Sequence, residues 1–214
     1  MSAPAPRFSR LEADERRQSI LAAARRLFVS SGPNAASTSA IAAEAGVTRG
    51  LVHHYFGTKR ELYLAVVEDL ATELPSVVRV DLRDRPVPEM VEANVVSWLD
   101  SIERERELWL ALLGAETVGR DPEVEAIMSR ARDAIIDRMV ANQARDTAAT
   151  PELRLVLRTY LGAAEAGARE WAMYGRATRA QVHAVLKGTL LAMVALVLPT
   201  VPPRPPTSSS SSSQ

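Results

Sequence analysis

Apolar residues recur every three or four positions through most of the chain, which is the spacing of an α-helix with one buried face. Ile20, Leu21, Ala24, Leu27 and Phe28 form the first such stripe. Strict alternation of apolar and polar residues, which would indicate β-strands, is rare. The pattern therefore predicts an all-α protein with about nine helices.

Helix-start signals divide this pattern into elements. Residues 9–12, 58–61 and 178–181 each place Glu or Gln three positions after Ser or Thr, which is the capping-box pattern. The dipeptides 121–122 and 150–151 place a capping residue before proline, which suits the first turn of a helix. These signals predict helix starts at five positions.

Residues 37–56 contain two short predicted helices joined by residues 45–47, Ala-Gly-Val. Gly46 can adopt the left-handed conformation that ends a helix, and small residues surround the crossing point. This is the helix-turn-helix pattern, and the apolar helix before it completes a three-helix head. In such a motif the second helix lies in the major groove of DNA. Val52 and Phe56 lie one turn apart and are expected to face the core.

Charge is distributed unevenly, although the formal net charge is zero. Residues 1–61 contain nine Lys or Arg and five Asp or Glu, so this segment carries +4 and the remainder −4. A basic head on an acidic body suits a polyanion such as DNA.

Several other classes of function are not expected. Cysteine is absent, which excludes disulfides, thiolate metal sites and cysteine nucleophiles. His53 and His54 point about 100° apart on a helix, so they rarely share a metal ion. We expect no metal, no cofactor and no enzymatic activity, because no nucleophile and base are paired by the sequence. A small helical enzyme would instead have a polar cleft and no DNA affinity.

The N-terminus lacks the apolar region of a signal peptide, and the apolar run 190–198 is shorter than the roughly 20 residues that a membrane span needs. A cytoplasmic protein without a membrane partner is expected.

The first 65 residues or so resemble the DNA-binding head of the tetracycline-repressor-like (TetR) family of transcriptional regulators. The matching residues are the run 20–28 (ILAAARRLF), Thr38, the run 41–48 (IAAEAGVT), Gly50, the pair 55–56 (YF) and the run 59–62 (KREL). The remaining two thirds match in general plan. The family usually has tyrosine where this chain has His53, which bears on the operator sequence and not on the mode of binding.

The resemblance, with the chemistry of each side chain, implies these DNA-binding residues: Thr38, Ser39, Arg49, Gly50, Leu51, His53, Tyr55 and Lys59. Arg49 is the main candidate base reader, because a guanidinium can bind O6 and N7 of guanine together. Leu51 could contact a thymine methyl group, and His53 a base or a phosphate. The hydroxyl groups and Lys59 are candidate phosphate contacts. His54 is expected to be a packing or surface residue.

We expect a DNA-binding domain at 9–65, an effector-binding and dimerisation domain at 66–199, and a disordered Pro/Ser-rich tail at 200–214. The resemblance implies that the last two helices pair with those of a second copy. The expected dimer residues are Leu157, Leu161, Ala164, Ala168, Trp171, Leu186, Leu190, Met193, Val194 and Val197, although an intrachain core must include some of them.

Ligand pockets in helical domains are mostly apolar with a few polar anchors. The candidate lining residues are Trp98, Trp109, Glu116, Met128, Met139, Tyr160 and Glu165. An acidic anchor at Glu116 or Glu165 would favour a cationic or hydrogen-bond-donating ligand.

The resemblance thus implies a homodimeric repressor that is released from a palindromic operator on double-stranded DNA by a small-molecule effector of unknown identity. A two-fold dimer fits half-sites about one turn of DNA apart. A DNA-binding dimer without an effector, and an activator, would have the same sequence features, and both remain open.

Overall fold

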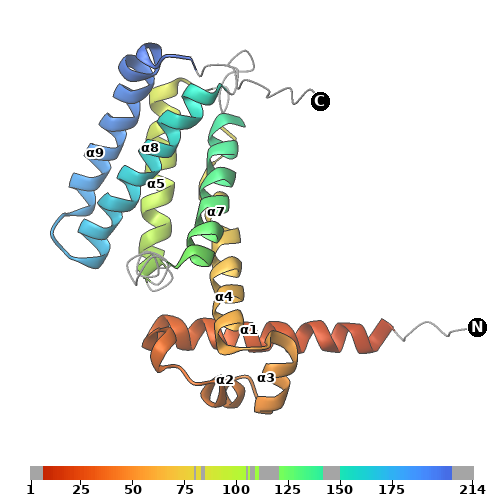
Figure 1. The fold of residues 1–214 in the computed structure, drawn as a ribbon. Helices are drawn as coiled ribbons and strands as arrows, with labels where there is room; N and C mark the ends of the chain where they lie inside the picture. Colours follow the sequence, from red (N-terminus) through yellow and green to blue (C-terminus); the bar gives the residue numbers. More distant parts are fainter. Residues whose placement is uncertain are drawn as a thin grey trace, which may run out of the picture. The chain divides into compact units, whose positions relative to one another are not determined.

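A computed structural model describes residues 7–79, 81–82, 85–104, 106, 109–110, 121–141 and 150–203. These residues form eight α-helices with short 3-10 and π-helical turns, and no strand occurs among them (Figure 1). The prediction of an all-α protein is confirmed. Part of the expected tail, residues 204–214, lies outside the described residues.

The chain divides into two compact units by its internal contacts. The first, called the head unit, combines residues 1–74 with 104–131, and the second, called the body unit, combines residues 75–103 with 132–214. This division differs from the expected boundary at 65/66, because the whole of α4 (Lys59–Glu73) and a later segment belong to the head unit. Helix α7 (Pro122–Ala141) contributes residues to both units.

The head unit begins with α1 (Arg7–Ala35), which is interrupted at Gly32, followed by α2 (Thr38–Glu44), α3 (Arg49–Phe56) and α4. Gly46 has a φ of 66°, so the predicted left-handed turn between α2 and α3 is confirmed. The four helices share one core, whose members include Ile20, Ala24 and Phe28 from α1, Ile41 from α2, Val52 and Phe56 from α3, and Leu62 and Val66 from α4.

The body unit contains α5 (Val87–Arg104), the second half of α7, α8 (Pro151–Ala168) and α9 (Arg179–Ala192). A π-helical turn, Arg169–Met173, continues α8, and another, Met193–Val197, continues α9. The core takes apolar side chains from all four helices, among them Val95 and Leu99 from α5, Ile136 from α7, Leu157 and Tyr160 from α8, and Leu186 and Leu190 from α9. This core positions the cavities described below.

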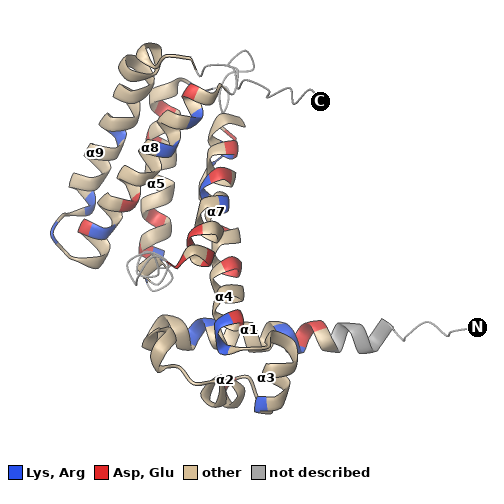
Figure 2. Ribbon diagram, viewed as in Figure 1, with Lys and Arg blue, Asp and Glu red and all other residues tan. Residues whose placement is uncertain are grey.

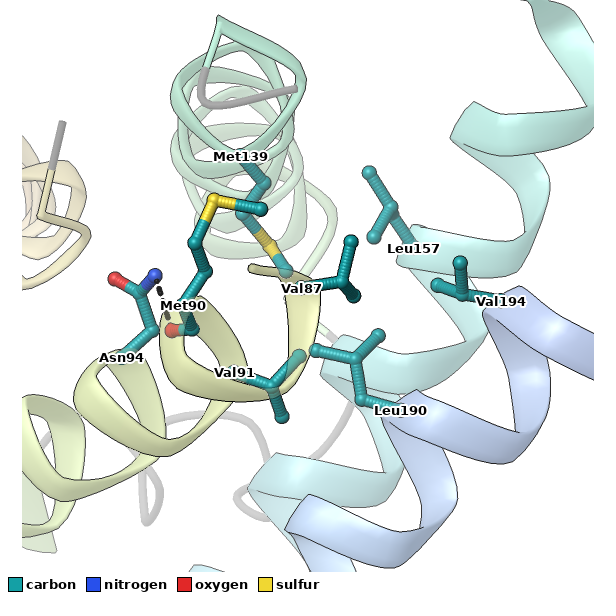
Figure 3. A pocket seen from close by; sticks show the side chains of 8 residues that line it. All are labelled: Val87, Met90, Val91, Asn94, Met139, Leu157, Leu190 and Val194. Atoms are coloured by element: carbon teal, nitrogen blue, oxygen red, sulfur yellow. Dashed lines mark hydrogen bonds between the residues drawn. The ribbon is translucent and has the colours of Figure 1, made fainter. Parts of the chain in front are cut away.

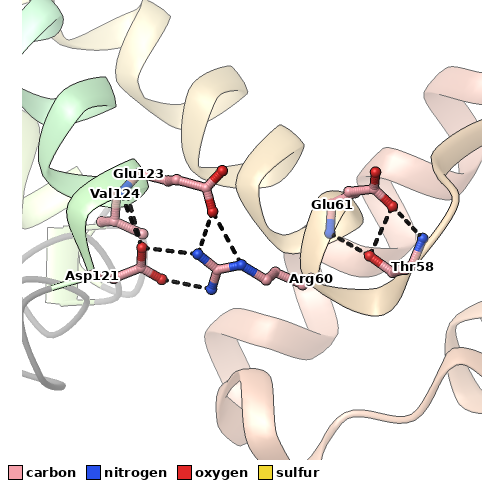
Figure 4. Close-up of polar contacts among 6 residues, drawn as sticks. All are labelled: Thr58, Arg60, Glu61, Asp121, Glu123 and Val124. Carbon is pink, nitrogen blue, oxygen red and sulfur yellow. Dashed lines mark hydrogen bonds and ion pairs between the residues drawn. The ribbon is translucent and has the colours of Figure 1, made fainter.

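The start of α4 is fixed by a complete capping box (Figure 4). The Thr58 hydroxyl accepts from the Glu61 backbone N–H at 3.1 Å, and the Glu61 carboxylate accepts from the Thr58 backbone N–H at 2.7 Å. These bonds satisfy two helix-end donors that would otherwise lack partners. The Thr58 backbone and hydroxyl hydrogen bonds lower the pKa of Glu61 below its ordinary value.

We predict that Thr58→Ala lowers the free energy of unfolding by about 1 kcal/mol, because it removes the hydroxyl that accepts from the helix end. The matched control in the same helix is Thr72→Ala, since the Thr72 hydroxyl donates to the Asp69 carbonyl of the helix itself and alanine favours helix. Urea denaturation at neutral pH measures both.

The pKa of Glu61 is lowered in the folded state, so its stabilisation is present at neutral pH and is lost as the pH falls below the ordinary pKa of glutamate. The difference between wild type and Thr58→Ala should therefore shrink on acidification. Equal losses of stability in the Thr58 and Thr72 variants would contradict the assignment.

Candidate functional site

Helix α3 has one buried face and one exposed face. Val52 and Phe56 are only 2% and 8% exposed, as predicted, whereas Arg49, Gly50 and His53 are exposed together. Figure 2 shows basic residues on α3 and along α1. The structure therefore brings the candidate base-reading residues together on the outward side of the second helix of the helix-turn-helix.

A chain of hydrogen bonds joins Arg49, His53 and Gly57. His53 Nδ1 lies 2.7 Å from the Gly57 carbonyl oxygen, so Nδ1 donates and Nε2 is left as the acceptor. Arg49 Nε then donates to His53 Nε2 at 3.4 Å. Gly57 has a φ of 70°, a conformation that glycine adopts without strain. His53 therefore holds Arg49 by one nitrogen and leaves both terminal amino groups of the guanidinium without a partner among the described residues.

The candidate phosphate contacts lie at the starts of two helices of the head unit. Ser37, rather than Thr38, caps α2, because its hydroxyl accepts from the Ala40 backbone N–H at 3.0 Å. This leaves the Thr38 hydroxyl for another partner. Lys59 Nζ donates to the Asn34 carbonyl at 3.1 Å, which uses one of its three protons and leaves two for a phosphate.

The other candidate contacts differ in exposure. Ser39 is exposed, whereas Leu51 and Tyr55 are half-buried. The Tyr55 ring packs edge-to-face against His54, with ring centroids 5.4 Å apart. This contact gives His54 a packing role and holds the Tyr55 ring beside the exposed face.

Arg60, which the sequence analysis did not single out, forms a cluster of ion pairs within the head unit (Figure 4). Its Nη1 and Nη2 donate to Asp121 at 2.8 and 3.0 Å, and its Nε donates to Glu123 at 3.1 Å. Arg60 lies in the first turn of α4, and Asp121 and Glu123 lie at the start of α7. We call these three residues the Arg60 clasp.

The clasp also completes the start of α7. Asp121 Oδ1 accepts from the backbone N–H of Glu123 at 3.0 Å, which confirms the predicted capping role of Asp121. The Arg60 hydrogen bonds lower the pKa of Asp121 to about 2. The carboxylate is therefore charged at any pH above about 4, and the clasp does not switch near neutrality.

Two small cavities lie in the body unit between α5 and the helices that pack against it. One, of about 40 Å³, is lined by Val87, Met90 and Val91 of α5 together with residues of α7, α8 and α9 (Figure 3). The second, of about 60 Å³, is lined by Trp98, Met139 and Tyr160, among others. Three of the seven predicted pocket residues thus surround one cavity. Asn94, which the sequence analysis missed, lines both cavities.

The other four predicted pocket residues lie elsewhere. Trp109 and Met128 are buried in the head unit, so they belong to its core and not to the cavity. Glu165 accepts from Arg132 Nε at 2.8 Å and from Nη2 at 3.3 Å, so its charge is already matched. Glu116 lies outside the described residues. The expected acidic anchor at Glu165 is therefore absent from the cavity lining.

The predicted dimer residues separate into two groups. Leu157, Ala164, Ala168, Leu186 and Leu190 are at most 5% exposed within the single chain, so they belong to its own core. Leu161, Trp171, Met193 and Val194 are half-buried, and Val197 is exposed. Arg158, Thr159 and Gln181 are also exposed on these helices. The remaining exposed positions include a set of apolar or small residues, which we call the outer face of α8 and α9: Leu155, Gly162, Ala163, Ala166, Ala184, Val185, Gly188, Ala192, Ala195 and Leu196.

Within the described residues, no group of three or more His, Asp or Glu side chains could hold a metal ion. His53 and His54 are therefore not part of such a group. The helical stretch Arg179–Thr200 contains an 18-residue window with a mean hydropathy of 1.8 and could cross a membrane by length and composition alone. The sequence analysis considered only the run 190–198, whereas the helix that contains it begins at Arg179.

Family comparisons agree with this geometry. Residues 20–66 match the bacterial regulatory proteins of the tetR family, and residues 87–193 match the tetracyclin repressor-like C-terminal domain. The chain is 34% identical over 142 residues to the transcriptional activator FasR of Mycolicibacterium smegmatis, covering 66% of this chain and 64% of FasR. It is 38% identical over 91 residues to the regulator SrpR of Pseudomonas putida, covering 42% of this chain and 41% of SrpR. The matches thus span less than two thirds of either relative.

Solved structures resemble the whole described fold. A tetR-family regulator from Streptomyces coelicolor superposes with a TM-score of 0.73 at 25% identity, covering 88% of this chain and 84% of that one. FadR of Thermus thermophilus, solved with lauroyl-CoA, superposes with a TM-score of 0.58 at 21% identity, covering 89% and 97%, and at that identity the likeness concerns the fold. With family matches over both its head and its body, the chain belongs to the TetR family of bacterial transcriptional regulators.

Proposed function

We propose that this regulator is a homodimeric repressor that binds a palindromic operator and leaves it when a small molecule binds the body unit. The observation that carries the proposal is the exposed face of α3, on which His53 holds Arg49 with both terminal amino groups unpaired by described residues. A guanidinium in this state can donate two parallel hydrogen bonds to guanine. The proposed action is DNA binding, not catalysis.

An activator is the second candidate function, because FasR, which matches over 142 residues, is described as a transcriptional activator. The repressor Rv3405c of Mycobacterium tuberculosis is 49% identical over 55 residues. DNA recognition would be the same in both cases. The position of the operator relative to the promoter distinguishes them.

The outer face of α8 and α9 supports a dimer. Leu155, Val185 and Leu196 are 56%, 62% and 70% exposed, which is costly for three large apolar side chains on neighbouring helices. The small residues between them permit close approach of another helix pair. A second copy would cover the same face on each partner, which is the two-fold arrangement that a palindromic operator requires. We therefore assign the apolar stretch Arg179–Thr200 to a dimer in the cytoplasm and not to a membrane.

The Arg60 clasp supports a route for regulation. It joins the start of α4, which follows the DNA-reading helix, to the start of α7. The same α7 helix carries Ile135 and Met139, which line the larger cavity. A ligand that displaces Met139 would act on the helix that holds the clasp. Allosteric coupling of this kind is typically worth about 1–3 kcal/mol.

Selection of bound fragments from a random duplex library tests DNA recognition. Wild type should recover one palindromic motif, and Arg49→Ala should lose guanine preference at one position of each half-site, at a cost of about 1–3 kcal/mol. His53→Ala should keep the motif with a weaker preference at that position, because Arg49 is no longer held. The control is His54→Ala, which removes the ring contact with Tyr55 and should leave the guanine preference unchanged even if total affinity falls, because the described bond of Arg49 goes to His53. Sequence-blind binding by wild type would rule out the proposed recognition.

Analytical ultracentrifugation tests the dimer. Wild type should sediment as a dimer at micromolar concentration, and Val185→Arg should sediment as a monomer, because it places a charge in the apolar interface. Ala126→Arg is the matched control, since Ala126 is exposed on α7 in the head unit. A monomeric wild type, or a dimeric Val185→Arg, would show that this face has another partner.

DNA affinity of the ligand-free protein tests the clasp. Arg60→Met should weaken operator binding by about 5- to 150-fold if the clasp maintains the DNA-competent head. The double variant Asp121→Asn, Glu123→Gln breaks the clasp from its other side and keeps Arg60. Both variants should therefore weaken binding. If only Arg60→Met does so, Arg60 contacts DNA directly and the clasp has no regulatory role.

A further inference from the structure

The two cavities of the body unit adjoin each other. They share Asn94, Met139 and Leu190 as lining residues. Along α5 the lining runs from Val87 through Asn94 to Trp98, which corresponds to about 16 Å of helix at 1.5 Å per residue. Together they therefore follow one elongated path along α5, with Asn94, Met139 and Leu190 at the place where they meet.

The path is narrow in this structure. The cavities measure about 40 and 60 Å³, whereas pockets for drug-sized ligands measure about 300–1,000 Å³. The flexible Met90 and Met139 side chains extend toward each other from α5 and α7 (Figure 3). Because methionine is unbranched and adapts to irregular space, rotation of Met139 is the smallest change that joins the two cavities.

The lining excludes a charged ligand. No charged side chain from the described residues lines either cavity. The Asn94 amide is already engaged, because Oδ1 accepts from the Arg79 backbone N–H at 2.8 Å and Nδ2 donates to the Met90 carbonyl at 2.9 Å. A buried charge without a partner would lose its hydration with no compensation.

Asn94 keeps one N–H and one lone pair, but Tyr160 offers a polar group whose bonding capacity is wholly unused by described residues. Tyr160 lines the larger cavity, is only 6% exposed, and its hydroxyl has no hydrogen-bond partner among the described residues. Burial raises the pKa of this phenol above its ordinary value, so the group is neutral and can both donate and accept. This hydroxyl therefore remains able to bond a polar group of a ligand in the larger cavity.

We propose that the body unit binds an uncharged, elongated apolar molecule with one polar end. The polar end bonds to the Tyr160 hydroxyl beside Trp98, and the apolar chain extends past a rotated Met139 toward Val87. This inference rests on the proposed ligand-responsive function and adds the chemical class of the ligand. It also replaces the cationic ligand that an acidic anchor would have favoured.

Three probes with the same twelve-carbon chain test the charge preference in the full-length protein. These are 1-dodecanol, dodecanoate and dodecyltrimethylammonium, each titrated below its aggregation concentration by calorimetry. Dodecanol should bind at least about tenfold more tightly than either ion, because only the neutral head is compatible with the lining. Tightest binding by either ion, or equal binding of all three, would overturn the proposal.

Two variants test the residues. Tyr160→Phe keeps the ring and removes the hydroxyl, so dodecanol affinity should fall about three- to tenfold. Its control is Tyr174→Phe, since Tyr174 is exposed and should have no effect. Met139→Trp should block the path and weaken dodecanol at least about tenfold, and Met139→Ala should not weaken it. Unchanged affinity in both Tyr160→Phe and Met139→Trp would place the probe elsewhere and refute the site.

Operator binding, measured in the same samples, separates this inference from the proposed function. If dodecanol binds as described but operator affinity is unchanged, the ligand class stands and release by a ligand of this class fails. If another compound releases the operator while no dodecyl probe binds, the regulatory function stands and the ligand class is wrong.

Discussion

The structure depends on the burial of one apolar face by each helix, because this burial fixes the rotation of every helix about its own axis. In α3, burial of Val52 and Phe56 leaves Arg49 and His53 no orientation except outward. The exposure of these candidate DNA-binding residues is therefore a consequence of core packing. The hydrogen bonds through His53 then add a finer control, because they set where the Arg49 guanidinium lies.

In the body unit two apolar regions are not fully packed: an exposed face of α8 and α9, and the space between α5 and its neighbours. Helices α8 and α9 bury Leu157 and Leu186 but still present Leu155 and Val185 to solvent, and the proposed second copy would bury them. Between α5 and its neighbours, packing is incomplete inside the unit, and methionines occupy the edges of the remaining space. The first defect suits a permanent partner with the same shape, and the second suits a small ligand that comes and goes.

The sequence predicted the head unit in detail because its signals are local. Gly46, the apolar stripe of α1 and the capping residues Thr58, Asp121, Thr150 and Thr178 each act over one or two turns, and the structure has them as expected. The predicted helix start at residues 9–12 is wrong, because α1 already begins at Arg7. It predicted the body unit less well, because helical spacing shows that a face is apolar but not what covers it. Leu157 and Leu190 therefore seemed suited to a dimer, although they pack within one chain.

Long-range pairing explains the other differences. Arg60 and Asp121 are 61 residues apart, so no spacing rule joins them. Trp109 and Met128 have the side chains of a ligand pocket, but the chain folds them into the head unit. Residue type thus indicated what could line a pocket, and only the fold decided which residues do.

The apolar lining of the cavities also bears on how a ligand could shift the equilibrium between two conformations of the protein. A ligand shifts an equilibrium only by its difference in affinity between two states. Burial of one methylene contributes about 0.8 kcal/mol, so about four methylenes that enter only the opened path would supply roughly 3 kcal/mol, the upper end of typical allosteric coupling. A rigid cavity of full size would bind the same ligand equally well in both states and would transmit nothing. If the proposed ligand binds only after Met139 moves, binding would be coupled to a side chain of α7, and apolar burial would then favour one state over the other.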